Sequence, residues 1–597
     1  MSYIYDDVGG FWRRPISGSF TPSGGNIVEQ TLFQIVSGAR DRSALSQELV
    51  RNICDWSTMF HLHPNRTNLL RPHEALLQSA SVLELGGGCG AVTRYLGETC
   101  ASVVMVEGSP HKSAIAAARC KGLENVSIYN DTIMQASLPK TSFDVVTLIG
   151  VLGSARVYDT MSEDPVQALL EKAYSMLSPG GVLFLAFENQ LGLKYLAGAP
   201  EDNYNIPMYG INDCYAEDGI VTFGRSESLA RLRRAGFVDV AEFLPFPDYK
   251  LPLLVVHPAA KEMAVEAFNV GTLVSEYIQR GHAPYTFSLE KAWNVVCRNG
   301  LLWDLSNSFC FVATKQPLVQ PEPCASATKN VLVSHYSTSR KLCFAKQTSF
   351  IKEGDAIYVH RRALSGEQPS AQPGEIKNSY PEKEQYHTYS KSSDGLFFIV
   401  NKKGWSAQDI AAWNKPLLKY WSKRTFLQHG TALLPGSMMD CIARNILVDK
   451  SGGVTLIDQE WQNETGNHPL SFLVAYNLLV TLSDVSDVEA PDAKTPLGIW
   501  MLTLKVIQEL HLKFPEQDQQ AFFLWLDAFH EIATGNKSAS DVYKTKMLTV
   551  RHSQRELSAY VHAQDRRIAA LNAKLSAMEQ ERNALQAILD KFTQRKE

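Results

Sequence analysis

The chain has 597 residues, of which 45% are hydrophobic and 20% charged, and its formal net charge is −4 at pH 7. Because one hydrophobic core stops growing beyond about 250–300 residues, we expect at least two domains. The composition excludes collagen, mucin-like stalks and global disorder, and the lack of a basic excess predicts no nucleic-acid partner.

Cysteine spacing and hydropathy bear on the compartment. None of the ten cysteines forms a C-x-x-C pair, which argues against a zinc knuckle or a thioredoxin motif and favours reduced thiols in a cytoplasmic protein. The N-terminus lacks the charged and apolar regions of a signal peptide. No apolar run reaches the ~18–20 residues that a membrane helix needs, so we expect no transmembrane segment.

Shifts in composition predict the domain boundaries. Residues 315–329 carry three prolines among small polar residues, which is typical of an extended linker. Glycine and proline are absent after Arg551. The expected units are a first domain at 1–318, a linker at 319–329, a second domain at 330–550 and a helical segment at 551–597.

Strand and helix patterns alternate through the first domain. The predicted strands are the short apolar runs at 81–85, 102–107, 143–150 and 182–188. The predicted helices are residues 91–98, 113–121 and 165–177. Apolar strands with intervening helices predict a parallel sheet that is covered on both faces, and such sheets bind ligands at the carboxyl ends of their strands.

A glycine-rich turn follows the first of these strands, and an acidic residue ends the second. Glycine lets the backbone turn sharply and approach a ligand closely. A carboxylate at the end of the second strand can accept hydrogen bonds from two ribose hydroxyls. The predicted cofactor-binding residues are therefore Glu84, Gly86, Gly88, Gly90 and Glu107.

A dinucleotide cofactor fits this turn less well. The sequence G-x-G-x-x-G is expected where helix amides meet a pyrophosphate, and its third glycine is missing here. The carboxylate of Glu84 beside the turn suits a cationic ligand better than a phosphate. S-adenosylmethionine (SAM) carries an ammonium and a sulfonium centre and no phosphate, so SAM is the expected cofactor.

The stretch Glu84–Gly90 resembles motif I of class I SAM-dependent methyltransferases, E/D-x-G-x-G-x-G. The resemblance covers about residues 60–315 and implies a Rossmann-like α/β domain. It implies that Glu107 binds the ribose and that Asp131 contacts the adenine amine. It also implies a closing antiparallel pair of strands, one within residues 245–258 and the other at 307–315.

Methylation of a hydroxyl requires a base near the sulfonium, because an alcohol is a poor nucleophile until it loses its proton. Glu188, at the end of a predicted strand, is the first candidate for this base. An insertion at 203–223 is expected on the substrate side. The other candidates are Asn189, Tyr204, Asp213, His61 and His63.

A second pattern lies within residues 330–550. Asp440 and Asn445 are five residues apart, and Asp458 follows Asp440 by 18 residues. This spacing resembles the catalytic loop and metal-binding strand of protein-kinase-like phosphotransferases, which have an α+β fold. The resemblance implies that Asp440 orients the acceptor hydroxyl, that Asn445 and Asp458 hold Mg²⁺, and that Lys346 contacts the phosphates of ATP.

The same stretch departs from the kinase pattern. Met438 and Met439 replace the expected His and Arg, and Gln459 and Glu460 replace Phe and Gly. The hairpin expected at 331–348 has no glycine for a phosphate-binding loop, and no helix glutamate can be assigned to Lys346. An active kinase and a pseudokinase both remain open.

The C-terminal segment repeats apolar residues with a period of seven, without glycine or proline. This pattern predicts a coiled coil that forms a homo-oligomer or docks on a helical partner, and the alternative is a single amphipathic helix packed on its own domain. The a positions hold Val561, Ile568, Leu575 and Leu589, and the d positions hold Leu571, Met578, Leu585 and Phe592.

The order of methyltransferase, kinase-like domain and coiled coil resembles that of bacterial O-antigen chain-terminating methyltransferase–kinases. The resemblance implies SAM-dependent O-methylation of a sugar hydroxyl on a surface polysaccharide of the lipopolysaccharide, which ends chain growth. It also implies a glycosyltransferase partner and peripheral placement at the inner membrane. The alternatives are a bifunctional enzyme that also phosphorylates the glycan, a small-molecule methyltransferase with a pseudokinase scaffold, and a scaffold that only binds SAM and ATP.

Overall fold

The computed structural model describes most of the chain up to residue 551. The described residues are 3–15, 25–138, 142–277, 285–317, 330–366, 376–388, 390–449, 453–463, 466–485 and 487–551, with 566, 573, 574 and 578. The predicted linker at 319–329 lies outside them, and so does nearly all of the predicted coiled coil at 551–597. Linker and coiled coil therefore stay predictions.

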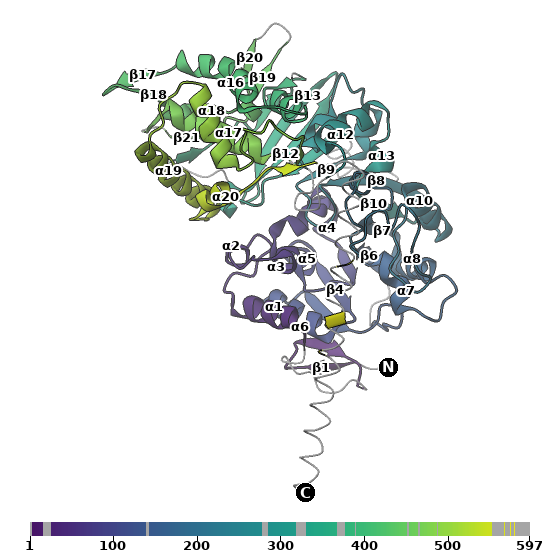
Figure 1. The fold of residues 1–597 in the computed structure, drawn as a ribbon. Helices are drawn as coiled ribbons and strands as arrows, with labels where there is room; N and C mark the ends of the chain where they lie inside the picture. The colour runs from purple at the N-terminus through teal and green to yellow at the C-terminus, as the bar shows by residue number, and fades with distance from the viewer. Residues whose placement is uncertain are drawn as a thin grey trace.

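One sheet of 14 strands dominates the described residues, and its first half carries the predicted fold (Figure 1). The strand order there is β5–β4–β3–β6–β7–β10–β8; β5 to β7 run parallel, and β10 is antiparallel to both of its neighbours. The strands are β3 (Ser81–Leu85), β4 (Ser102–Glu107), β5 (Val126–Asn130), β6 (Phe143–Ile149), β7 (Leu177–Glu188), β8 (Asp239–Phe246) and β10 (Ser308–Thr314). The Rossmann-like α/β prediction is confirmed.

Helices cover both faces of this half of the sheet, as the buried strands require. Alternate residues of β3 show it: Val82 packs with Leu96 of α5, whereas Leu83 packs in the cluster that contains Leu169 of α8. Figure 1 places α1, α5 and α6 to the left of the strands and α7, α8 and α10 to the right. The helices are α1 (Ile27–Gly38), α2 (Gln47–Val50), α3 (Trp56–Leu62), α4 (Glu74–Leu77), α5 (Ala91–Thr99), α6 (Pro110–Cys120), α7 (Ala155–Tyr158), α8 (Pro165–Met176), α9 (Leu193–Leu196), α10 (Arg225–Arg234), α11 (Val270–Ser275), α12 (Leu289–Arg298) and α13 (Leu302–Leu305).

The closing antiparallel pair differs from the prediction. The partner of β10 is β8 at 239–246, whereas residues 245–258 were expected to supply that strand. Proline cannot donate to a ladder, and Pro247 and Pro252 break this stretch. Residues 254–256 form a separate short strand, β9 (Leu254–Val256), which pairs with β8 on one side.

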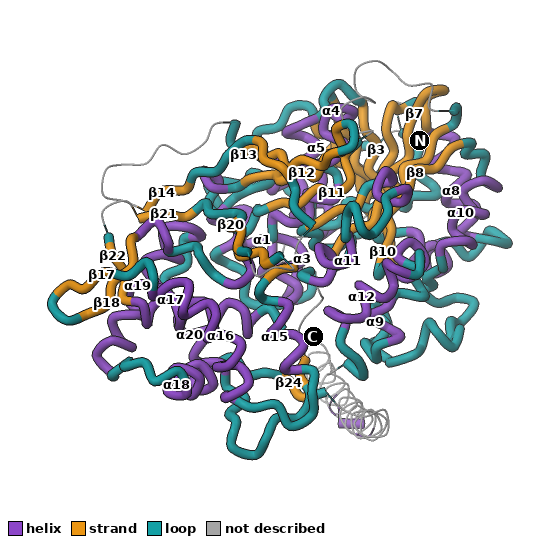
Figure 2. The backbone as a smooth tube through the Cα atoms, turned by 90° about the horizontal axis from the view of Figure 1, so that it is seen from above, coloured by secondary structure: helices purple, strands orange, loops and turns teal. Residues whose placement is uncertain are grey.

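On its other side β9 pairs with β11 (Val331–Tyr336), so the sheet continues past the predicted linker. His335 lies opposite Leu254 in this ladder. Figure 2 shows β11, β12 and β13 in a row that leads to β8 and β7. Backbone hydrogen bonds thus join the stretches predicted as the first and second domains. The sheet ends with β12 (Lys346–Glu353), β13 (Ala356–Ala363) and β15 (Lys383–Gln385), and at its other edge with β2 (Phe11–Arg13) and β1 (Ile4–Asp6).

Beyond this sheet, the second unit is built from helices and four small sheets around a core of its own. Helix α17 (Leu470–Ser483) is buried on all sides except at its ends, which is typical of a central core helix. The other helices are α15 (Asp394–Val400), α16 (Ala407–Ser422), α18 (Ile499–Glu509), α19 (Glu516–Thr534) and α20 (Ala539–Thr545). The strands are β14 (Ile376–Asn378), β16 (Ser390–Lys391), β17 (Phe426–Gln428), β18 (Thr431–Pro435), β19 (Ile446–Val448), β20 (Val454–Leu456), β21 (Trp461–Asn463), β22 (Asn467–Pro469), β23 (Asp487–Val488) and β24 (Thr549–Val550).

Within the described residues, no helix combines the length and the apolar character that crossing a membrane requires.

Candidate functional site

A cavity of about 510 Å³ lies at the carboxyl ends of the parallel strands. It is lined by the glycine turn after β3, by Glu107 and Gly108 at the end of β4, by residues 132–134 after β5, and by residues 149–151 at the end of β6. Such an edge is where open α/β sheets bind ligands. The structure therefore brings four strand ends to one cavity, which we call the first pocket.

The glycines of the turn adopt backbone conformations that other residues rarely take. The φ angles of Gly86, Gly88 and Gly90 are 79°, 56° and 79°. A Cβ on Gly90 would lie 2.7 Å from the Cα of Ala116 in α6, whereas a Cβ on Gly88 would meet nothing within 4 Å. Gly90 is therefore required for close packing of the turn on α6, and Gly88 is required only for its backbone angle.

Alanine at these two positions should separate strain from crowding. We expect Gly88→Ala to cost about 1–2 kcal/mol for the left-handed conformation, and Gly90→Ala about 2–5 kcal/mol because overpacking adds to the strain. Thermal unfolding of the two variants measures this difference. Equal decreases in Tm would show that the contact with α6 contributes nothing.

Glu107 holds the turn in place. One carboxylate oxygen, Oε2, accepts a hydrogen bond from the backbone N–H of Gly88 at 3.0 Å. The other, Oε1, accepts one from the N–H of Ser109 at 2.9 Å. Because each oxygen of an ionised carboxylate has two acceptor sites, Glu107 can accept further hydrogen bonds from the pocket.

Glu84 reaches the first pocket from inside the sheet. Its side chain is buried, and among the described residues its Oε2 has no hydrogen-bond partner. Burial raises the pKa of Glu84 to about 7, and the negative charge of Glu107 also acts in this direction. Thr93 and the charge of Arg66 lower this pKa, but by less than burial raises it. A buried carboxylate of this kind favours a cationic ligand, which would restore its ionised form.

Asp131 lies differently from the prediction. The cavity is lined by its neighbours Thr132, Ile133 and Met134, not by Asp131. Arg14 forms an ion pair with Oδ2 of Asp131 at 2.8 Å, and the hydroxyl of Tyr3 donates to the same oxygen at 2.5 Å. The N-terminal strands β1 and β2 extend the sheet beyond β5, and the residues that flank them, Tyr3 and Arg14, bind the carboxylate of Asp131. The sequence pattern could not reveal these contacts.

Glu188, the predicted base, ends β7 but does not line the first pocket. Lys250 lies 2.5 Å from its Oε1, and the hydroxyl of Tyr249 donates to the same oxygen at 3.2 Å. Tyr249 itself lines the pocket. The structure therefore places Tyr249 between Glu188 and the cavity.

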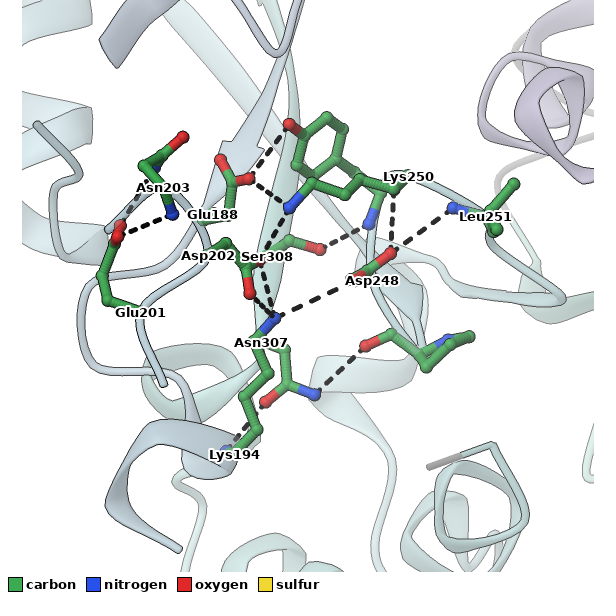
Figure 3. Close-up of polar contacts among 12 residues, drawn as sticks. Glu188, Lys194, Glu201, Asp202, Asn203, Asp248, Lys250, Leu251, Asn307 and Ser308 are labelled. Atoms are coloured by element: carbon green, nitrogen blue, oxygen red, sulfur yellow. Dashed lines mark hydrogen bonds and ion pairs between the residues drawn. The ribbon is translucent and has the colours of Figure 1, made fainter. Parts of the chain in front are cut away.

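A chain of buried charges continues from Glu188 (Figure 3). Lys250 also lies 2.6 Å from Asp202, and Lys194 lies 2.9 Å from Asp202 and 3.9 Å from Asp248. Burial opposes the charge on Lys250, but Glu188, Asp202 and Asp248, with Tyr249, together outweigh it and raise the pKa of Lys250 well above its usual value. Each charge thus faces an opposite one, which is the condition for burying them.

The other base candidates are spread out. His61 lines the first pocket, but burial and the nearby charges of Arg66 and Lys112 lower its pKa to about 3. Burial lowers the pKa of His63 to about 4. Asn189 donates to backbone carbonyls at 304 and 306 as a structural contact, Tyr204 stacks on Tyr209, and Asp213 is exposed.

A second cavity, of about 450 Å³, lies where β11 and β12 face the loops around β19 and β21. We call it the second pocket. It collects the four residues singled out by their spacing, which are Lys346, Asp440, Asn445 and Asp458. Residues more than 90 positions apart thus face one cavity, as the kinase-like pattern requires.

The acidic partner of Lys346 is Glu460, which replaces the glycine of the kinase pattern. Lys346 lies 2.6 Å from Glu460 and 3.1 Å from Asp458, and Arg340 lies 2.6 Å from Glu460. Glu276, at the end of α11, pairs with Lys391 instead. Glu460 therefore provides the acidic partner of Lys346, in place of the helix glutamate that the sequence did not reveal.

Asp440 is held by the segment that carries these acids. Its Oδ2 accepts hydrogen bonds from the N–H groups of Glu460 and Trp461, and its Oδ1 accepts one from Asn445 at 3.1 Å. Burial raises the pKa of Asp440 to about 7, and the charges of Glu460 and Asp458 add to the effect. The oxygen atoms of Asn445 and of the 42%-exposed Asp458 suit Mg²⁺, which prefers oxygen ligands.

Comparisons with known proteins match the part of the chain that contains the glycine turn. Residues 83–183 match the family model described as Methyltransferase domain. Demethylmenaquinone methyltransferase from Tropheryma whipplei strain Twist is 32% identical over 102 residues, which are 17% of this chain and 39% of that protein. The protein of strain TW08/27 matches with the same figures. The chain thus spans only 39% of the length of these curated relatives.

Solved structures that resemble the chain include a SAM-dependent methyltransferase from Thermotoga maritima, with a TM-score of 0.26 and 16% identity. That alignment covers 46% of this chain and 99% of the other. N-methyltransferase NodS from Bradyrhizobium japonicum WM9, in complex with S-adenosyl-L-homocysteine, gives a TM-score of 0.23 and 20% identity, and covers 34% of this chain and 90% of the other.

Residues 83–183, which contain the glycine turn and Glu107, therefore match a methyltransferase domain. Several residues of the first pocket escaped the sequence analysis. Tyr249 comes from a proline-flanked turn with no motif, and Lys112 comes from the start of α6. Only their position in the fold brings them to the cavity.

Proposed function

We propose that this chain is a SAM-dependent O-methyltransferase that acts on a sugar hydroxyl of a bacterial surface polysaccharide and ends its growth. The observation that supports SAM most directly is that Glu84 and Glu107 both line the cavity beside the glycine turn. The two carboxylates offer acceptors for a cation and for ribose hydroxyls.

The residues of the first pocket fit SAM in the following way. Glu107 would accept hydrogen bonds from the ribose, and Glu84 would face the ammonium group. Residues 132–134 would lie along the adenine, since they follow the strand next to β4 on the side away from Glu84. Arg66 is buried with its Nε unpartnered among the described residues, and it would meet the carboxylate. Bound SAM would supply the methyl group on a sulfonium centre.

Cofactor binding should depend on pH through Glu84. In the free protein its carboxyl group has a pKa of about 7, and a cation favours the ionised form. Binding therefore requires loss of a proton below this pKa and none above it. We expect S-adenosylhomocysteine, which keeps the ammonium group, to bind about tenfold more weakly at pH 6 than at pH 8. Calorimetry over this range measures it, and Glu84→Gln should remove the pH dependence.

The reaction is tested by incubating the full chain with methyl-labelled SAM and a panel of surface-type oligosaccharides and small-molecule alcohols. Label in an oligosaccharide supports the proposed acceptor class. Label only in small molecules would favour the small-molecule alternative. Binding of SAM with no transfer to either class would favour the scaffold alternative.

For the second pocket we propose that Asn445 and Asp458 hold Mg²⁺ with ATP, that Lys346 contacts its phosphates, and that Asp440 orients a hydroxyl of the glycan. The support is the meeting of these four side chains at one cavity. The chain would then be a bifunctional methyltransferase and kinase. A pseudokinase would either fail to bind ATP and Mg²⁺ or bind them without transferring a phosphoryl group.

We further propose that residues 551–597 form a coiled coil that makes the protein a homo-oligomer and recruits a glycosyltransferase. The heptad pattern of the sequence supports this proposal. Removal of residues 552–597 should leave SAM binding unchanged and convert the oligomer into a smaller species in sedimentation experiments.

A further inference from the structure

We propose that Tyr249 is a catalytic residue of the methyl-transfer site, whose hydroxyl oxygen faces the transferable methyl group and accepts a hydrogen bond from the acceptor hydroxyl. The inference rests on the proposed use of SAM in the first pocket. It assigns to Tyr249 the contact with substrate that the sequence pattern had suggested for Glu188.

The position of Tyr249 is the first argument. Its side chain is only 4% exposed, yet it lines the first pocket. A Cβ on Gly150 would lie 2.8 Å from its hydroxyl oxygen, so this oxygen stands directly beside the backbone that follows β6. Gly150 has a φ of 73° and leaves the room that the hydroxyl occupies.

The order of the strands places the two halves of SAM. Glu107 ends β4 and residues 132–134 follow β5, so adenosine belongs at this side of the cavity. The methionine half must then extend over β3 toward β6, which are the next strands in the sheet. Tyr249 and Gly150 lie on that side, and Glu84 lies on β3 between the two ends. The sulfonium joins the ribose to the methionine chain, so this placement puts it over β3, next to β6, beside whose end the Tyr249 hydroxyl lies.

The contacts of Tyr249 decide what its hydroxyl can do. The hydroxyl of Tyr249 donates its hydrogen to Oε1 of Glu188 at 3.2 Å. The ammonium group of Lys250 lies 2.5 Å from that same glutamate oxygen. A carboxylate is only an acceptor, so it directs the tyrosine hydrogen away from the cavity. The lone pairs of the tyrosine oxygen are then free to accept a hydrogen bond from the pocket. Figure 3 shows Glu188 and Lys250 directed at each other.

This arrangement provides a path for the proton. As the acceptor oxygen bonds to the methyl carbon, the carbon–sulfur bond breaks and its electron pair goes to sulfur. The hydroxyl proton passes to the oxygen of Tyr249, whose own proton passes to Oε1 of Glu188. One positive charge disappears at sulfur and one negative charge at Glu188, so the net charge of the site is unchanged.

Sinefungin tests this placement without any acceptor. It is a SAM analogue that carries an amine where SAM carries the sulfonium methyl, so its amine can donate a hydrogen bond to Tyr249. S-adenosylhomocysteine lacks any group at that place. In calorimetry, Tyr249→Phe should weaken sinefungin by about 10–100-fold, because a hydrogen bond to a charged group is lost, and S-adenosylhomocysteine by less than about twofold.

A matched control is Tyr195→Phe. Tyr195 is also 4% exposed and lies near the same charges, but its hydroxyl has no hydrogen-bond partner among the described residues and does not line the cavity. Neither ligand should bind this variant differently from the wild type.

The outcomes are distinct. Failure of the wild-type protein to bind S-adenosylhomocysteine would overturn the proposed cofactor site and this inference with it. Equal weakening of both ligands by Tyr249→Phe would place the tyrosine elsewhere along the cofactor and overturn the inference alone, as would no change in either. If Tyr249→Phe does not fold, Glu188→Gln serves instead, since its amide can donate to the tyrosine oxygen and should selectively weaken sinefungin.

Discussion

Replacement of Glu107 by alanine is expected to abolish tight binding of SAM. Its two carboxylate oxygens hold the N–H groups of Gly88 and Ser109 and are the acceptors proposed for the ribose. Hydrogen bonds to a charged group contribute about 1.5–3 kcal/mol each, so loss of two to the ribose weakens binding by roughly 100-fold or more. Calorimetry with SAM and S-adenosylhomocysteine measures the change.

A suitable control for this variant is Glu124→Ala. Glu124 is an exposed glutamate in the turn before β5 and does not line the first pocket. It should bind both ligands as the wild type does. An unchanged SAM affinity in Glu107→Ala would contradict the cofactor assignment, since no other described carboxylate occupies the end of β4.

If the second pocket binds ATP and Mg²⁺ as we propose, Asp458→Asn is expected to remove most of the stabilisation that they would give to the second unit. A ligand at 100 times its Kd stabilises a protein by about 2.7 kcal/mol, and 100-fold weaker binding leaves about 0.4 kcal/mol. The carboxylate of Asp458 is 42% exposed, while Lys346 keeps its ion pair with Glu460, so the fold itself should survive the change. Thermal unfolding with and without ATP and Mg²⁺ measures both effects.

Asp355→Asn is the matched control, because Asp355 is an exposed aspartate in the turn between β12 and β13 and lies outside the second pocket. ATP should raise its Tm as much as that of the wild type. If ATP and Mg²⁺ leave the wild-type Tm unchanged, the second unit is not a nucleotide-binding domain. If the Tm rises but no label moves from γ-labelled ATP to a glycan, a pseudokinase is the better description.

The two pockets share a structural element. Tyr249 lines the first pocket, and Leu253 and Leu254 line the second. Asn68 at the end of a 3-10 helix donates both to the carbonyl of Pro252 and to Thr338 beyond β11. The proposed methyl-transfer and phosphate sites are therefore built on one continuous segment, residues 249–254.

Local sequence patterns predicted the first half of the fold closely. The strands at 81–85 and 102–107 and the helix at 165–176 begin where the hydrophobic period and the prolines and glycines indicate. The glycine turn and Glu107 were predictable for the same reason, since both depend on residues that are neighbours along one βαβ unit. The hydrophobic pattern gave a wrong strand at 245–258. Apolar residues continue there across two prolines, but the strand hydrogen bonds stop at the end of β8 and resume at β9.

The sequence by itself determined the parallel α/β sheet, the glycine turn with Glu84 and Glu107, and the spacing of Asp440, Asn445 and Asp458, because each depends on short-range periodicity or on contacts within one supersecondary unit. Only the tertiary structure decided that Arg14 forms an ion pair with Asp131 and that Glu460 forms one with Lys346. It also decided that Tyr249 lies between Glu188 and the cavity. These contacts join residues 61–117 positions apart along the chain. A buried charge is costly unless it is paired, so each one pairs with an opposite charge that the folded chain brings close to it.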